Sequence, residues 1–248
     1  MLKIKKYCRF EQMIWRRLFL LALTVLGVIK SQAQEGFRIG PTAMFLSSRS
    51  SVIDSLPNHF YFRYKSGFSF GLSAQYGFTP KFTLATGVSF TSKGYRVFND
   101  SNKNGTILKH NINHIEVPLN MIFKIRMNTS SNMRGVLGVS LNSVLSKDKH
   151  EEMNANKTFI IREETKNKIY PMLNLGVEIA NENKAGNIFC FGIFYKQAFE
   201  QNSILKVYNK TTATTPRFEL GFRGSYIGVS LTYLFNLQNF RKDEEFFY

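Results

Sequence analysis

Residues 169–179 read IYPMLNLGVEI, and every second residue of this stretch is apolar. Residues 68–78 (FSFGLSAQYGF) and 115–125 (IEVPLNMIFKI) alternate in the same way. A period of two over ten or more residues indicates a β-strand, because successive side chains of a strand point to opposite faces. Similar runs occupy 36–46, 81–92, 133–145, 187–199 and 217–236, so the sequence predicts eight strands.

The connections between the predicted strands alternate between short and long. Those at 79–80, 127–132 and 181–186 are short and carry Pro, Asn or Gly, which favour tight turns. The long ones lie at 47–66, 93–111, 146–168 and 201–216. All long loops then lie at one end of an up-and-down chain, which is the plan of outer-membrane barrels. The sequence predicts an all-β, eight-stranded antiparallel up-and-down transmembrane β-barrel.

The two faces of the predicted strands decide which side meets lipid. One face is rich in Phe, Ile, Leu and Val, and the other is dominated by small polar residues such as Gly71, Ser73 and Ser140. A soluble barrel would put Lys and Glu on the outer face, whereas small residues suit a crowded interior. The alternative is a secreted barrel with an apolar interior that holds a small lipid, which would be found in the aqueous fraction.

The apolar parity switches once, within the predicted last strand. Positions 218, 220 and 222 are apolar before Arg223-Gly224-Ser225, and positions 227, 229 and 231 are apolar after it. We expect either a β-bulge or the point where the strand leaves the membrane.

The first 33 residues have the form of a secretory signal peptide. Arg16-Arg17 precede a short apolar run from Leu18 to Ile29, and Ser31-Gln32-Ala33 provides small residues at a cleavage site. A membrane anchor is the alternative, although twelve apolar residues are too few for a spanning helix. We therefore predict a signal peptide at 1–33, an outer-membrane barrel at 34–238 and a periplasmic tail at 239–248, with Met1 and Met13 both open as the start.

Composition excludes several classes of protein. The chain has 248 residues with 24 Phe and 11 Tyr, too much apolar surface for a disordered chain. Two cysteines, of which Cys8 lies in the predicted signal, exclude a disulfide scaffold. We expect no nucleic-acid partner despite the net charge of +16, because the basic residues gather in the predicted loops of an exported protein.

Four charged residues fall on the inward parity of the predicted strands. They are Glu116, Lys124, Glu178 and Lys196, with Glu219 and Arg223 added if the parity switch permits. Charges in a narrow lumen must pair, so we predict a structural polar cluster in which Glu178 pairs with Lys196 on the adjacent strand. A path for protons or a solute is the alternative.

Most of the remaining charge lies in the long connections. Basic residues predicted at the rim are Arg96, Lys103, Lys109 and Lys206. Outer-leaflet lipopolysaccharide is anionic, so we expect these residues to contact it. A structural or interaction role through the basic loops follows, with lipopolysaccharide, a surface polymer or a secretion partner as the ligand.

The histidines give the only indication of an enzyme. His59, His110 and His150 lie in three long connections, and His114 lies at the head of a strand. A site at the extracellular rim would need a base beside a nucleophile or an acid, and no spacing singles one out. We expect no enzyme activity, cofactor or metal. Substituting the four histidines together separates the two hypotheses, because only a rim enzyme would lose activity.

Several segments resemble one family. Residues 76–82 (YGFTPKF), 114–119 (HIEVPL) and 135–145, with a last strand at 228–235 (GVSLTYLF), resemble the PorT-like outer-membrane β-barrels of the Bacteroidota. The resemblance implies an eight-stranded barrel in the outer membrane with periplasmic termini, whose last strand is recognised by the barrel assembly machinery. It implies little about activity, and the role of one member in type IX secretion does not transfer with the fold.

Overall fold

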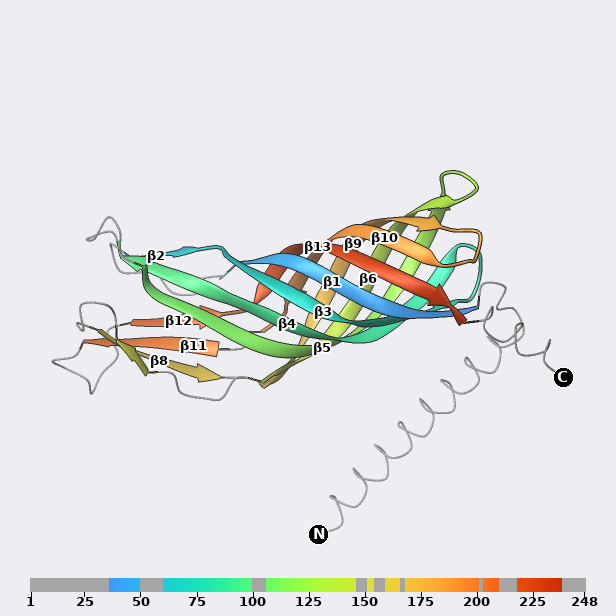
Figure 1. The fold of residues 1–248 in the computed structure, drawn as a ribbon. Coiled ribbons are helices and arrows are strands. Elements are labelled where there is room, and N and C mark those ends of the chain that lie inside the picture. Colours follow the sequence, from blue (N-terminus) through green and yellow to red (C-terminus); the bar gives the residue numbers. More distant parts are fainter. Residues whose placement is uncertain are drawn as a thin grey trace, which may run out of the picture.

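The computed structural model describes residues 36–49, 60–99, 106–145, 151–153, 159–165, 168–200, 203–209 and 218–237. Eight antiparallel strands close into a barrel with the order β4-β3-β1-β13-β10-β9-β6-β5, and β5 pairs with β4 to complete the ring (Figure 1). The barrel strands are β1 (Phe37–Arg49), β3 (Lys65–Gly77), β4 (Phe82–Asn99), β5 (Thr106–Arg126), β6 (Ser131–Val144), β9 (Ile169–Glu182), β10 (Ile188–Ala198) and β13 (Ser225–Asn236). The predicted eight-stranded barrel is confirmed.

The predicted faces of the strands are also as expected. On β10 buried and exposed residues alternate along nearly the whole strand, with Phe189, Phe191 and Ile193 exposed on the outer wall. The outer faces of the other barrel strands carry exposed Phe, Leu, Ile, Val and Met in the same way. Small and polar side chains occupy the inner faces. An apolar outer wall around a polar interior is the arrangement of a barrel that faces lipid.

The two ends of the barrel differ. At the short-turn end, tight turns at Phe78–Phe82, Met127–Ser131 and Asn183–Asn187 join the strands. Asn side chains stabilise two of these turns: Asn128 Oδ1 accepts from the Ser131 amide at 2.6 Å, and Asn183 Oδ1 accepts from the Asn187 amide at 3.0 Å.

Aromatic pairs gather near the short-turn end. Their ring centroids are 4.9 to 5.1 Å apart in Tyr76–Phe78, Phe82–Phe123 and Tyr233–Phe235. Such a girdle is typical of a membrane interface, where the rings lie at the level of the headgroups.

The described parts of the long connections are mostly strands, which corrects the prediction of loops at those residues. Residues 93–99 and 106–111 belong to β4 and β5, which remain paired as far as Phe98 and Thr106. β2 (Phe60–Arg63) pairs with the far part of β4. A second sheet has the order β12-β11-β8-β7, from β7 (Glu151–Met153), β8 (Phe159–Thr165), β11 (Ser203–Asn209) and β12 (Phe218–Phe222). Figure 1 shows β2, β8, β11 and β12 together at the end opposite the short turns, the long-strand end.

The predicted strand at 217–236 is two strands. β12 belongs to the second sheet and β13 belongs to the barrel, so the switch of apolar parity marks the point where the chain passes from one to the other. Gly224 lies between them with a φ of 72°, a left-handed conformation that glycine adopts without strain.

The predicted signal peptide at 1–33 and the tail at 239–248 lie outside the described residues. None of the described segments forms a helix of the length and apolarity needed to span a membrane.

Candidate functional site

The middle of the lumen is occupied by a buried ion pair. Lys196 on β10 donates to Glu116 on β5, and Tyr226 on β13 donates its hydroxyl to the other carboxylate oxygen of Glu116 at 2.8 Å. Glu116 is fully buried and the Lys196 side chain is 9% exposed. Two neighbouring strands, β10 and β13, therefore meet β5 across the lumen through one carboxylate.

A second lysine lies beside this pair in an aromatic environment. Lys93 on β4 is fully buried, with its Nζ 4.9 Å from the ring centre of Tyr226 and 5.5 Å from that of Tyr170. The same Nζ lies 3.7 Å from the sulfur of Met172. Among the described residues, no carboxylate lies within ion-pair distance of Lys93, so aromatic rings and sulfur surround its amine.

Apolar and aromatic side chains close the lumen between the ion pair and the long-strand end. They form a buried cluster of Leu46, Tyr170, Met172, Ala198 and Tyr226. His114 on β5 lies against this cluster, with its ring 5.8 Å from that of Tyr170 and its Nδ1 3.1 Å from the Ile112 carbonyl oxygen. His114 is buried inside the barrel rather than exposed at the rim.

The structure contradicts the predicted pairing of Glu178 with Lys196. Both side chains point into the lumen, but Glu178 lies opposite Gly192 on β10, while Lys196 lies opposite Asn174. Four residues along a strand is about 13 Å, which separates the two charges. Glu178 instead lies opposite Arg134 on β6, and the pair for Lys196 comes from across the lumen.

A second group of buried and half-buried charges lies in the lumen towards the short-turn end. Arg134 is buried and donates to Gln75 Oε1 at 3.3 Å and to the sulfur of Cys190 at 3.4 Å. Lys124 is half-buried at the position opposite Arg134. Arg38 pairs with Glu182 at 3.0 Å. The interior cluster predicted from Glu116, Lys124, Glu178 and Lys196 is thus spread over two levels of the lumen.

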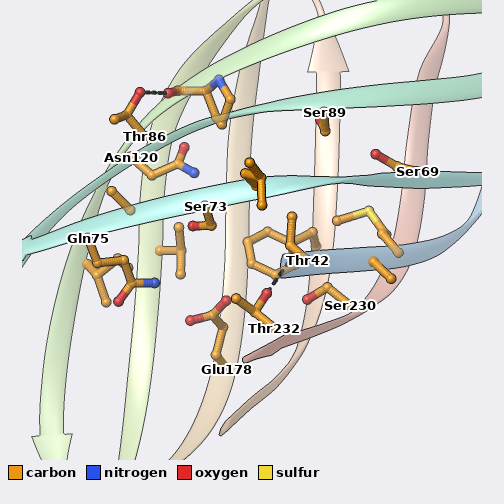
Figure 2. A pocket seen from close by; sticks show the side chains of 18 of the residues that line it. Thr42, Ser69, Ser73, Gln75, Thr86, Ser89, Asn120, Glu178, Ser230 and Thr232 are labelled. Carbon is orange, nitrogen blue, oxygen red and sulfur yellow. Dashed lines mark hydrogen bonds between the residues drawn. The ribbon is translucent and has the colours of Figure 1, made fainter. Parts of the chain in front are cut away.

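A small cavity lies between these two levels (Figure 2). Its volume is about 80 Å³, and its lining is mixed: Ser and Thr hydroxyls, Glu178, Gln75 and Asn120 alternate with apolar side chains. The hydroxyls of Thr42 and Thr232 meet at 2.8 Å along one side. This space suits a few water molecules, whereas sites for drug-sized ligands measure about 300–1,000 Å³. The lumen is therefore filled by the protein's own side chains.

Basic residues align in one row at the long-strand end. Arg63 on β2 lies opposite Arg96 on β4, and Arg96 lies opposite Lys109 on β5. The register therefore brings three basic residues to one level of three neighbouring strands. Arg96 Nε is buried without a hydrogen-bond partner among the described residues.

Lys206 and Lys103, the other two residues predicted to contact lipopolysaccharide, are not part of this row. Lys206 on β11 forms an ion pair with Glu164 on β8 at 2.8 Å, so its charge is already compensated. Lys103 lies outside the described residues, as do His59 and His150. His110 lies in β5 opposite Tyr95.

Sequence reasoning missed several residues of the lumen, among them Lys93, Arg134 and Tyr226, and one residue of the basic row. Lys93 lies on the inward parity of β4, but its segment was interpreted as a loop. Arg134 and Tyr226 also lie on inward parity, which could have identified them. Arg63 could be assigned to the row only once the register between β2 and β4 was known.

Comparison with known proteins supports the fold. The family model described as outer membrane protein beta-barrel domain matches residues 31–203. No curated protein matches the chain. The crystal structure of the outer membrane protein OprG from Pseudomonas aeruginosa is similar, with a TM-score of 0.55 at 12% identity over 83% of this chain and 99% of OprG. Neisserial surface protein A has a TM-score of 0.47 at 13% identity, covering 81% of this chain and 97% of that protein.

Proposed function

The chain belongs to the outer membrane protein β-barrel domain family, and we propose that it is a non-conducting, non-enzymatic barrel that binds lipopolysaccharide through the basic row Arg63, Arg96 and Lys109. The observation that carries this proposal is the register, which brings three basic residues to one level of three neighbouring strands. Repulsion within the row is relieved when an anion lies against it. Phosphate groups are strong partners for arginine, because a guanidinium binds them through two parallel hydrogen bonds.

The position of the row along the barrel suits the outer leaflet. The last apolar positions of the outer wall on this hairpin are Phe90 and Ile115, and the row lies six residues further along β4. Six residues of a strand span about 20 Å, and the tilt of barrel strands reduces the height to about 15 Å above the apolar wall. This is the level of the phosphates and core sugars rather than of the acyl chains.

The filled lumen supports a role at the outer surface rather than transport. Glu116, Lys196 and Tyr226 occupy the middle of the lumen, and the cluster around Tyr170 closes the end above them. An eight-stranded barrel has an interior just wide enough for such side chains. A surface polymer or a secretion partner is the alternative ligand of the long-strand end.

The orientation and lineage are part of this proposal. We place the short-turn end and both termini in the periplasm, with export through residues 1–33 and insertion by the barrel assembly machinery. The order of long and short connections supports this orientation. The sequence resemblance of the His114-Ile115-Glu116-Val117-Pro118-Leu119 segment supports a place among the PorT-like barrels of the Bacteroidota, and this segment supplies Glu116 to the lumen.

Charge reversal tests the proposal. The triple variant Arg63→Glu, Arg96→Glu and Lys109→Glu reverses the charge of the basic row, and the matched control reverses Lys81, Arg126 and Lys184 at the short-turn end. Binding of lipopolysaccharide to the folded protein in detergent is measured for each. We expect about tenfold weaker binding for the first triple and little change for the control. Equal loss in both variants would refute a specific site.

A further inference from the structure

The outer wall of the barrel carries an apolar groove over β1. It has a volume of about 710 Å³ and crosses β1 between β3 and β4 on one side and β13 and β10 on the other. Pro41 and Ala43 lie at its floor, because they are the small residues on the outward parity of β1. The remaining lining is Thr42, Phe70, Gly71, Leu72, Val88, Phe90, Phe189, Leu231, Thr232 and Tyr233.

The sequence explains why the wall is hollowed here. The outward positions on both sides of the floor carry bulky residues, so the side chains of neighbouring strands stand above Pro41 and Ala43. Phe70 packs against Phe90 with ring centres 5.4 Å apart, and Phe68 stacks on Phe70 at 6.1 Å, which fixes one side of the groove. Phe189 lies opposite Tyr233 and forms the other side.

We propose that this groove binds one acyl chain of a phospholipid. The groove is continuous with the lipid-facing wall of an outer-membrane barrel, and its lining is almost entirely apolar. Its volume falls in the range of built ligand sites, and aromatic sides offer a large rigid contact area at low entropic cost. A separate outer groove around Gly135 is smaller, at about 580 Å³, so the groove over β1 offers an acyl chain the larger of these two apolar sites.

The direction of the groove identifies the leaflet. It begins near Phe189 and Tyr233, which lie close to the short turn at Asn183–Asn187, and it runs towards Phe70 and Phe90 in the middle of the wall. A chain that enters from the short-turn end therefore comes from the leaflet on that side. This step rests on the proposed orientation, in which the short-turn end faces the periplasm and the leaflet there contains phospholipid.

The test uses a phosphatidylethanolamine that carries a photoactivatable diazirine on its acyl chain. The folded full chain is reconstituted in vesicles that contain this probe, and the labelled peptides are mapped by mass spectrometry. We expect labelling to concentrate on the segments around Phe70, Phe90, Phe189 and Tyr233. Uniform labelling around the barrel would overturn the proposal.

Variants with a larger side chain on the floor of the groove are compared with a control variant elsewhere on the outer wall. Ala43→Phe places an aromatic ring on the floor of the groove, and Ala43→Leu places a smaller side chain there. Because residue 43 is exposed on the outer wall, neither substitution disturbs the interior of the barrel. The control Gly135→Leu fills a separate outer groove, where a Cβ would meet no atom within 4 Å. We expect about fivefold less labelling at the four segments in the Ala43 variants and unchanged labelling in the control. Unchanged labelling in both Ala43 variants would overturn the proposal.

Two further readouts separate this site from the proposed function. Competition with unlabelled phosphatidylethanolamine must reduce labelling of the groove, and competition by lipid A alone would overturn the phospholipid assignment. Lipopolysaccharide binding is measured on the same preparations, where Ala43→Phe should leave it unchanged. A wild-type protein that fails to bind lipopolysaccharide but keeps labelling that depends on Ala43 would refute the basic row and leave the groove intact.

Discussion

Lys196 and Glu116 lie on barrel strands that are separated by two others, and their charges meet in the middle of the lumen. A contact of this kind connects opposite walls of the barrel. It also leaves little room for a passage, because Tyr226 reaches the same carboxylate from a third strand. The ion pair and Tyr226 therefore fill the middle of the lumen, and in this sense the barrel is closed.

Glu116→Gln removes the negative charge on which this arrangement depends. Lys196 then remains buried without a counter-charge, and Lys93 loses the nearest carboxylate. Breaking a buried ion pair costs about 3–5 kcal/mol, and we expect the free energy of unfolding to fall by that amount. Urea titration in phospholipid vesicles measures it. The control Glu164→Gln breaks the more exposed pair with Lys206 and should cost less than about 1 kcal/mol.

Tyr226→Phe removes a hydrogen bond to a charged acceptor and leaves the ring in place. We expect a loss of about 1.5–3 kcal/mol in the free energy of unfolding, because Glu116 loses one of its two described partners. Tyr233→Phe is the matched control, since the Tyr233 hydroxyl accepts only a long hydrogen bond of 3.4 Å from Asn187. Equal stability of the two variants would contradict the assigned role of Tyr226.

Lys93→Met should behave differently from the variants of the ion pair. Methionine has a similar length and suits a site formed by Tyr170, Tyr226 and Met172. Loss of the interaction with the rings is offset because a charge is no longer buried, so we expect a change within about 1 kcal/mol. A loss as large as that of Glu116→Gln would show that the amine of Lys93 is part of the ion-pair network.

Gly71→Ala tests the close packing of the barrel wall. A Cβ at this position would lie 2.1 Å from the Val88 carbonyl oxygen and 2.6 Å from the Ser89 Cα, both on the neighbouring strand. The backbone cannot give way without breaking the β3–β4 ladder, so we expect a large drop in the folded fraction. Gly135→Ala meets nothing within 4 Å and should fold normally. Gel migration with and without boiling reports the folded fraction of each variant.

The part of the fold that lies against lipid could be predicted from the sequence. Alternation of apolar and small residues, as at 169–179, arises because one face meets hydrocarbon and the other a crowded lumen. Residues 93–99 and 106–111 lack this alternation because these parts of β4 and β5 extend beyond the apolar wall, so the sequence predicts a loop there. β2, β7, β8 and β11 were missed for the same reason, whereas β12 was predicted as part of the strand at 217–236.

The candidate site was predicted in part. Parity identified Glu116 and Lys196 as inward-facing, since a period of two fixes the face of each residue. The partner of each charge depends on the stagger between strands and on which walls approach across the lumen, and neither can be read from one strand alone. That is why Glu178 was assigned to Lys196, and why Arg63 was not assigned to the basic row.

The most direct test of the closed barrel is conductance across a planar lipid bilayer after insertion of the folded protein. A lumen filled by Glu116, Lys196, Tyr226 and the cluster around Tyr170 predicts no stable conductance steps above the background of the bilayer alone. Reproducible ohmic steps from the wild-type protein would show an open passage and contradict the proposal that this barrel acts through its outer surface.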